Sequence, residues 1–240
     1  MNIANATAEA RSAPSKRSDH LNDPAAKIAR EGRPFVWGGL VAGGLLLLLG
    51  SATLGSIALA FGLFSILFFR NPQPKTPALP GVAVSPAHGK VVVVERAFEP
   101  HFLKDDALHI AVFLNVVDVH INRAPVRGRV LEQLYHPGRF LSATSDKCAD
   151  ENERNHIVFE CDEEGGRGKK VLLTQIAGLI ARRIVSHVRK GDGYERGEAF
   201  GLIRFGSRTD VWLPADTRPL IAIGDRVVGG ETILGELRSG

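Results

Sequence analysis

The longest apolar segment of the chain lies near its N-terminus, and no charged residue occurs between Phe35 and Phe69. One transmembrane helix needs about 20 apolar residues, so this segment is too long for one untilted span and slightly short for two ideal ones. Gly50, Ser51 and Gly55 near its middle offer a place to turn. The pattern therefore predicts a hydrophobic helical hairpin over residues 34–70 that anchors the protein, either spanning a membrane or deeply entering one leaflet.

The segments on both sides of this hairpin are polar. Residues 1–33 are rich in Ala, Ser, Asn and charge without a sustained apolar stripe, which predicts a flexible or partly helical tail. Residues 71–80 are rich in proline and predict a stiff linker. Basic residues flank the hairpin on both sides, and this favours both of its ends in the cytoplasm. We therefore expect an inner-membrane protein whose C-terminal domain faces the cytoplasm.

Beyond the linker, residues 81–240 follow a β pattern and predict one domain. Short β-branched segments bounded by Gly, Pro or charged residues predict strands over 90–95, 107–114, 128–134, 156–161 and 169–176. Residues 163–169 have the composition of a hairpin turn, and residues 177–188 fit either a strand or a short helix.

An internal repeat refines this picture of the domain. The chain contains two copies of a Gly-Asp/Gly-Glu motif: Gly191-Asp192 with Gly197-Glu198, and Gly224-Asp225 with Gly230-Glu231. Such a repeat is typical of lipoyl-like hairpins in a quasi-symmetric barrel, although simple turn chemistry also explains it. The fold class expected is α+β: a β-rich, barrel-like domain with lipoyl-like hairpins, preceded by the hydrophobic helical hairpin.

Composition narrows the possible functions. The formal charge of +4 is mild, and the basic residues form no dense block with interleaved aromatics, so no nucleic-acid partner is expected. The two cysteines, Cys148 and Cys161, make neither a disulfide framework nor a Cys-x-x-Cys zinc motif. The eight histidines show no His-x-His or His-Glu-x-x-His spacing, and Asp118-x-His120 alone is a weak signal, so no metal is expected.

The residues that suggest chemistry are Gly206 and Ser207, which lie between two short apolar stretches and so at a tight bend. Glycine leaves its own carbonyl sterically open, and the serine hydroxyl lies beside that carbonyl. An N-to-O acyl shift, elimination and hydrolysis at this bond would leave a pyruvoyl group on the new N-terminus. Most Gly-Ser pairs are ordinary turns, so the pair alone does not establish this chemistry.

Longer motifs around this bend resemble a known family. The segments KGDGYERGEAFGLIRFGSRTDVWLP (residues 190–214), DVHINRAP (118–125) and NERN (152–155) are similar to those of the short, membrane-anchored phosphatidylserine decarboxylases, which depend on a pyruvoyl group. The resemblance extends from the hydrophobic hairpin to residue 240.

This resemblance implies a function and a cofactor. Self-cleavage after Gly206 would give a β chain of residues 1–206 and an α chain of residues 207–240, with Ser207 converted to the pyruvoyl cofactor. The amine of phosphatidylserine in the membrane would form a Schiff base with that group, lose carbon dioxide and give phosphatidylethanolamine. The two chains would stay partners, and a homodimer is also implied.

The resemblance also suggests roles for side chains. His120 would return a proton after decarboxylation, since imidazole titrates near neutral pH, although a structural histidine at a strand end is the simpler alternative. Asp118 lies on the same strand face if the strand continues, and would orient or charge that imidazole. Guanidinium groups bind phosphate and carboxylate, so one or two of four arginines are expected to meet the lipid headgroup: Arg154, Arg182, Arg183 and Arg204.

Two positions depart from the family pattern. His88 stands where the family has the aspartate of its Pro-Ala-Asp-Gly turn; either His88 serves as general base for the Ser207 hydroxyl, or maturation is slow or absent. Arg123 stands where longer forms have a second histidine, and it cannot accept the proton.

Two other functions fit parts of the sequence. A non-enzymatic adaptor with a lipoyl-like barrel explains the anchor and the repeat but not Gly206-Ser207. A pyruvoyl enzyme acting on a soluble amino acid explains the bend but not the anchor, which concentrates an enzyme at a lipid interface.

Overall fold

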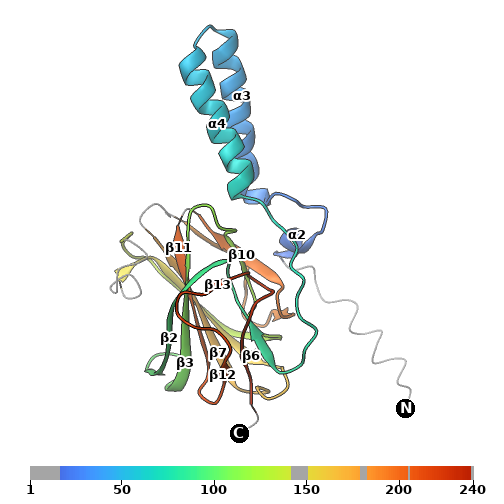
Figure 1. Cartoon of the computed structure of the whole chain (residues 1–240), viewed down its shortest axis with the longest axis vertical. Helices are drawn as coiled ribbons and strands as arrows, with labels where there is room; N and C mark the ends of the chain where they lie inside the picture. Colours follow the sequence, from blue (N-terminus) through green and yellow to red (C-terminus); the bar gives the residue numbers. More distant parts are fainter. Residues whose placement is uncertain (1–16, 142–150, 179–182, 205, 239–240) are drawn as a thin grey trace, which may run out of the picture.

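The protein consists of a β domain and a pair of antiparallel helices that project from one end of it (Figure 1). The computed structural model describes residues 17–141, 151–178, 183–204 and 206–238. The two long helices, α3 (Arg33–Leu48) and α4 (Ala52–Phe68), lie within the predicted hairpin and turn at Gly50, whose φ is +80°. Among the described residues, no helix is both long enough and apolar enough to cross a membrane.

Glycines bring α3 and α4 into close contact. A methyl group built on Gly39 would lie 2.6 Å from the Gly62 backbone, and one on Gly43 would lie 2.8 Å from the Leu59 nitrogen. Backbones that approach this closely leave no room for a side chain, as in other small-residue helix pairs. The apolar side chains consequently point outward, and the most exposed are Trp37, Leu48, Leu49, Ile57 and Leu63.

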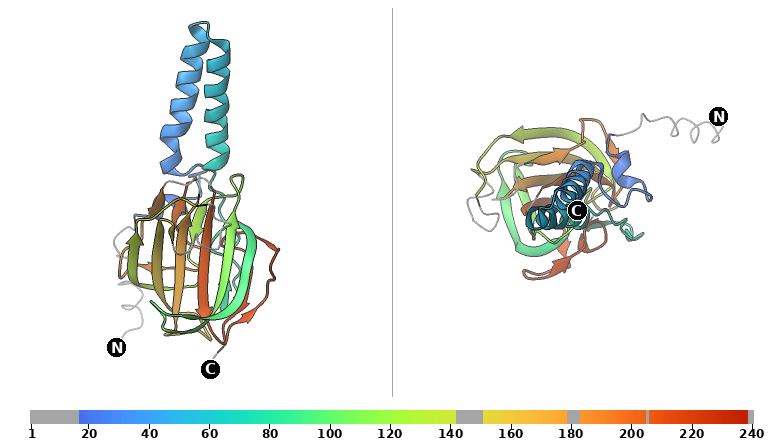
Figure 2. Two further views of the ribbon diagram at one scale, coloured as in Figure 1. Left: turned by 90° about the vertical axis from the view of Figure 1, so that its left-hand side faces the viewer. Right: turned by 90° about the horizontal axis from the view of Figure 1, so that it is seen from above.

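The described residues of the β domain form three antiparallel sheets. The largest curls into a half-barrel, visible from the side and from above in Figure 2, with strand order β13-β2-β3-β11-β7-β6-β5-β9. Its strands are β2 (Gly89–Glu99), β3 (Asp105–Leu114), β5 (Gly128–His136), β6 (Arg154–Cys161), β7 (Lys170–Ala177), β9 (Gly193–Tyr194), β11 (Ser207–Pro214) and β13 (Arg226–Val227).

Two small sheets complete the domain. One has the order β1-β14-β12 and the other β4-β10-β8. Their strands are β1 (Val82–Val84), β4 (Ile121–Arg123), β8 (Ile184–Ser186), β10 (Ala199–Ile203), β12 (Arg218–Pro219) and β14 (Ile233–Glu236). The main core includes buried side chains from β3, β6, β7, β10, β11 and β14, such as Ile110, Phe159, Leu173, Phe200, Val211 and Leu234. The mostly β architecture agrees with the sequence prediction.

The two copies of the Gly-Asp/Gly-Glu repeat have the same local structure. Gly191 and Gly224 have φ values of +93° and +102°, while Gly197 and Gly230 both have +79°. The aspartate carbonyls of the two copies accept hydrogen bonds from Val130 on β5 and Val91 on β2. These turns lead into β9 and β13, the two edge strands of the large sheet. The two copies of the repeat therefore form equivalent turns before the two edge strands of the large sheet.

The described part of the segment before the helices is partly helical, which is one of the two predicted alternatives, and it packs against the rest of the protein. Residues 19–22 form α2 (Asp19–Asn22), residues 30–32 form the 3-10 helix η1 (Arg30–Gly32), and both contact the β domain or the helix base. Leu21 and Ala29 are buried in a second core with Phe68 and Phe69 from the end of α4 and with β4 and β10 residues. Burial of Leu21 orders this part of the segment despite its polar composition.

This packing makes a testable prediction for the hairpin. Gly38 and Gly39 are neighbours on α3, but a methyl group at Gly38 meets nothing within 4 Å. Gly38→Ala is expected to stabilise the hairpin by up to about 1 kcal/mol, because alanine is the better helix former. Gly39→Ala is expected to destabilise it by about 1–3 kcal/mol, because the helices must separate. Thermal unfolding in detergent measures both, and equal effects would contradict the close packing.

Candidate active site

The bend between β10 and β11 is formed around Gly206. Its φ is +64°, in the left-handed region that glycine adopts without strain. A side chain at this position would have room, since the nearest atom to an added methyl group is Val116 Cγ2 at 3.8 Å. The backbone conformation, and not crowding, is therefore what favours glycine here. Phe205 lies outside the described residues.

Ser207 follows the bend as the first residue of β11. It pairs with Leu114 of β3 on one side and Ala177 of β7 on the other, so its backbone is fixed in the middle of the large sheet. Its side chain is fully buried, and among the described residues its Oγ has no hydrogen-bond partner. Buried hydroxyls are normally paired, and an unpaired one at a fixed position is available as a nucleophile.

His120 contacts the bend directly. The Gly206 N–H donates to His120 Nε2 at 3.2 Å, and His120 Nδ1 lies 2.9 Å from the carbonyl oxygen of Asp118. A carbonyl only accepts, so Nδ1 carries the hydrogen and Nε2 presents its lone pair to the bend. The two hydrogen bonds thus define one neutral tautomer. The structure brings His120, Gly206 and Ser207 together as the sequence predicts.

The surroundings of His120 keep it neutral. Its side chain is buried, and burial lowers the pKa of His120 to about 4. Phe68, the last residue of α4, covers the imidazole with a ring-centroid distance of 4.2 Å. At neutral pH His120 is therefore a base and not an imidazolium, and the base of the helical hairpin forms part of its environment.

Asp118 orients the His120 ring through its backbone carbonyl, and its carboxylate acts to raise the pKa of His120 against the larger effect of burial. β3 ends at Leu114 and the chain turns over residues 115–118, so Asp118 and His120 do not continue one strand. The Asp118 carboxylate accepts the Asn115 N–H and pairs with Arg226, while its backbone carbonyl orients the His120 ring. The orienting group is the peptide carbonyl of Asp118, and the carboxylate holds the turn.

His88 lies in the same neighbourhood, in the bend before β2. Its Nδ1 accepts the Gly229 N–H at 3.2 Å, so neutral His88 carries its hydrogen on Nε2. Burial, reinforced by the charge of Arg123, lowers the pKa of His88 to about 4. Among the described residues no hydrogen bond joins His88 to Ser207. The role of His88 as general base stays a prediction, and it would require the other tautomer.

Arg123 has a structural role. Its buried guanidinium donates to the carbonyls of Gly197 and Pro72 at 3.0 and 2.9 Å, and so connects the linker after α4 to the first repeat turn. Burial lowers the pKa of Arg123 to about 10, which leaves it charged at neutral pH.

The four arginines proposed for the headgroup occupy different places. Arg182 lies outside the described residues, and Arg183 is exposed. Arg154 lies opposite Ile176 of β7, and Ile176 lies opposite Arg208 of β11. The Arg154 side chain is therefore on the sheet face opposite the Ser207 side chain. Arg204 lies under the hairpin, 5.1 Å from the Phe35 ring centre, and its buried Nε has no hydrogen-bond partner among the described residues. A headgroup role stays a prediction for all four, and the geometry favours Arg204.

Sequence reasoning missed a second arginine near the site. Arg70 follows α4 and donates to the carbonyls of Leu67 and Val117, both at 2.7 Å. It thereby connects the end of the hairpin to the turn that carries Asp118. Its position directly after the apolar segment is the sequence feature that could have pointed to this role.

A row of buried amides supports β11 from the same face as Ser207. Asn122 donates to Thr209 Oγ1, Gln175 donates to Asn122, and Asn155 donates to Gln175, at 3.1, 2.8 and 2.9 Å. Thr209 lies two residues from Ser207 and on its side of the sheet. The motif residues Asn122 and Asn155 therefore hold the frame of the site.

The contact of Phe68 with His120 makes a prediction. Phe68→Ala is expected to admit water to the imidazole and raise the pKa of His120 by about one unit or more, because burial is the main cause of its low value. An NMR titration in the Ser207→Ala background, in which residue 207 has no hydroxyl that could attack the Gly206 carbonyl, measures this pKa. Phe61→Ala, an exposed position on the same helix, is the control. An unchanged pKa in Phe68→Ala would contradict the proposed shielding.

Comparisons with known proteins agree on one family. A family model described as phosphatidylserine decarboxylase matches residues 61–235. A protein of Symbiobacterium thermophilum named phosphatidylserine decarboxylase proenzyme is 48% identical over 210 residues, covering 88% of this chain and 95% of its own. Proteins of the same name from Geotalea uraniireducens and Burkholderia multivorans are 46% and 44% identical, covering 88% and 90% of this chain and 96% and 99% of their own.

Proposed function

This chain belongs to the phosphatidylserine decarboxylase family, and we propose that it makes its own prosthetic group at Ser207. It is an enzyme that decarboxylates phosphatidylserine. Family membership rules out the non-enzymatic adaptor as its main function. The observation that carries the proposal is the buried, unpaired Ser207 Oγ next to a glycine in the left-handed conformation. A homodimer stays a prediction from the resemblance.

The proposed maturation uses the chain's own atoms. The Ser207 Oγ attacks the Gly206 carbonyl carbon, the peptide C–N bond breaks, and the hydroxyl proton passes to the departing nitrogen. Loss of the Cα proton of residue 207 then expels the Gly206 carboxylate and leaves dehydroalanine. Hydrolysis of that enamine releases ammonia and leaves a pyruvoyl N-terminus. We propose that His120 Nε2, a neutral base hydrogen-bonded to Gly206, accepts a proton during these steps.

Position 207 suits such a group. It is fully buried and lies in a central strand, so a carbonyl formed there is held in place and shielded from water. The pyruvoyl group, once formed, supplies the electrophilic carbonyl and electron sink that decarboxylation of an amino acid needs.

Cleavage would change the role of His120. It leaves a carboxylate on Gly206, the residue whose N–H contacts His120 Nε2. A negative charge this close raises the pKa of an imidazole. His120 would therefore act as a base during maturation and hold a proton at Nε2 afterwards, which suits a donor to the substrate carbon.

The two chains would stay together after cleavage. Residues 207–240 contribute β11, which pairs with β3 and β7, together with β13 on β2 and β14 on β1. These pairings and the core residues Val211 and Leu234 do not depend on the bond between Gly206 and Ser207. The products would form one folded unit.

We propose also that the hairpin inserts into the membrane. Its outward side chains are apolar, with Leu48 and Leu49 at its tip 85% and 82% exposed. Three exposed basic residues, Lys27, Arg30 and Arg33, surround its base, where anionic headgroups would attract each by about 1 kcal/mol. Because Phe68 at this base contacts His120, such insertion would put the site near the headgroups. A cytoplasmic orientation at the inner membrane stays a prediction.

Maturation predicts specific masses. Denatured wild-type protein is expected to give two chains split after Gly206, the smaller reactive toward hydroxylamine, while native gel filtration keeps them together. Ser207→Ala is expected to stay intact. His120→Asn is expected to slow cleavage at least tenfold, because it removes the base next to Gly206.

His88 is tested in the same assay. If His88→Ala abolishes cleavage while His120→Asn cleaves normally, His88 and not His120 is the base, and the proposed assignment is wrong. A single, keto-free wild-type chain would overturn the whole maturation scheme.

The hairpin predicts lipid-dependent activity. Leu48→Glu/Leu49→Glu is expected to abolish flotation with vesicles of anionic lipid and to lower decarboxylation of vesicle phosphatidylserine at least tenfold, while cleavage after Gly206 and activity on a short-chain soluble phosphatidylserine persist. Leu79→Glu is the control, because Leu79 is an exposed leucine outside the hairpin. Equal flotation of the double variant and wild type would contradict membrane insertion.

A further inference from the structure

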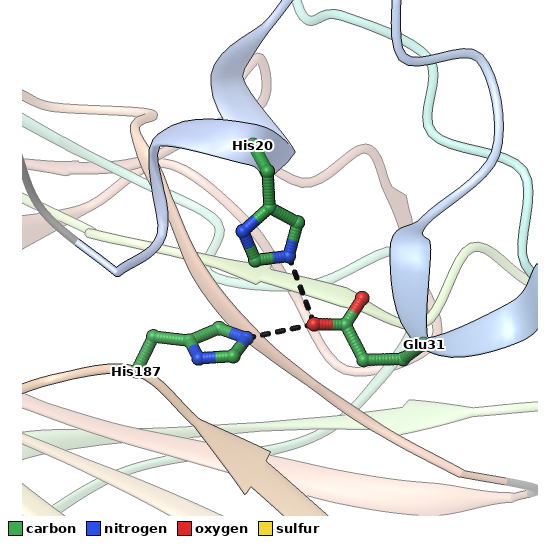
Figure 3. A group of neighbouring side chains, drawn as sticks. All are labelled: His20, Glu31 and His187. Atoms are coloured by element: carbon green, nitrogen blue, oxygen red, sulfur yellow. Dashed lines mark hydrogen bonds and ion pairs between the residues drawn. The ribbon is translucent and has the colours of Figure 1, made fainter.

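Three side chains that the reaction does not use meet at the junction between the hairpin and the β domain. His20 of α2, Glu31 of η1 and His187, directly after β8, converge on one point (Figure 3). His20 Nε2 lies 2.9 Å and His187 Nε2 lies 2.8 Å from the same Glu31 oxygen, Oε1. All three side chains are partly buried.

Hydrogen bonds and ion pairing leave one buried polar atom of this group without a partner. His20 Nδ1 lies 2.9 Å from the Arg17 carbonyl, so it must donate, and Nε2 facing a carboxylate must donate as well. Both bonds together require a doubly protonated His20. The second carboxylate oxygen, Glu31 Oε2, is buried and has no hydrogen-bond partner among the described residues.

We propose that His20, Glu31 and His187 bind a zinc ion. Two imidazole nitrogens and one carboxylate are a common protein ligand set for Zn²⁺, with water in the fourth position. The candidate ligand atoms lie within 4.8 Å of one another, whereas ligands around tetrahedral zinc are separated by about 3.3 Å at bond lengths of about 2.0–2.1 Å. Shifts of less than an ångström would accommodate the ion.

A zinc ion is compatible with the His20 contacts and gives Glu31 Oε2 a partner. The His20 Nδ1–H would still donate to the Arg17 carbonyl while Nε2 gives its lone pair to the metal, which is the usual arrangement of a ligating histidine. The Glu31 carboxylate can turn so that both oxygens face the ion, which gives Oε2 a partner.

The site would have a structural role. It joins α2 and η1, which precede the hairpin, to the strand region at β8, and so fixes the base of α3 on the β domain. The sequence prediction of no metal rested on short-range spacing, but His187 lies 156 residues from Glu31. Only the fold brings these ligands together.

Metal content tests the proposal on the full-length protein, purified in detergent with a tag that lacks histidine. After removal of metal with a chelator and addition of Zn²⁺, gel-filtered wild type is expected to retain one zinc per chain by elemental analysis. Zn²⁺ is also expected to raise its unfolding temperature, because binding stabilises the folded state. Co²⁺ in its place is expected to give the visible absorption of a tetrahedral site.

Asparagine variants separate metal binding from hydrogen bonding. In His20→Asn and His187→Asn an amide can still donate to Glu31, but affinity for Zn²⁺ is expected to fall at least tenfold and the thermal shift to disappear. His101→Asn, at an exposed histidine outside this group, is expected to behave as wild type. Wild type that retains no zinc, or retains as much as the two asparagine variants, would show a hydrogen-bonded cluster only and overturn the proposal. Cleavage after Gly206, measured in the same samples, is independent of this outcome.

Discussion

The position of β11 between β3 and β7 is the constraint on which the rest of the site depends. Backbone hydrogen bonds on both sides fix Ser207, while the residue before it stands at a bend in the left-handed conformation. The proposed nucleophile and the carbonyl that it would attack are therefore adjacent, with Ser207 fixed in the large sheet and Gly206 outside its strands. Such positioning lowers the entropy cost of bringing the reacting groups together.

The helical hairpin and His120 share one small core. Phe68 packs with Leu21, Ala29 and β-domain residues, and the same ring covers His120. Arg70 adds hydrogen bonds from the end of α4 to the turn before His120. A hairpin that served only as a tether would need no contact with the imidazole. Here the end of the hairpin helps to bury His120, and burial lowers the pKa of that imidazole.

Much of the molecule could be predicted from the sequence, because the signals were local. The apolar run gave the hairpin, β-branched segments gave the long strands, and the motifs gave Gly206, Ser207 and His120. The way in which Asp118 orients His120 could not be predicted, since it depends on a turn at residues 115–118 that the apolar pattern does not show. The packing of residues 17–33 was also missed, because it comes from burial of Leu21 against distant strands and not from local propensity.

Alternate residues of β11 take part in different polar networks on the two faces of the sheet. On the Ser207 side, Thr209 ends the amide row. On the other side, Arg208 pairs with Asp210 through two hydrogen bonds of 2.6 and 2.8 Å, and Asp210 also meets His109, whose ring stacks on Trp212.

Breaking one partner of a buried charge pair costs about 3–5 kcal/mol, so these contacts oppose any shift of β11 along its neighbours. A one-residue slip would also turn Ser207 to the opposite face of the sheet. In the proposed maturation, the choice of one peptide bond would therefore depend on the register of a strand that is held from both faces, as much as on the chemistry of the serine itself.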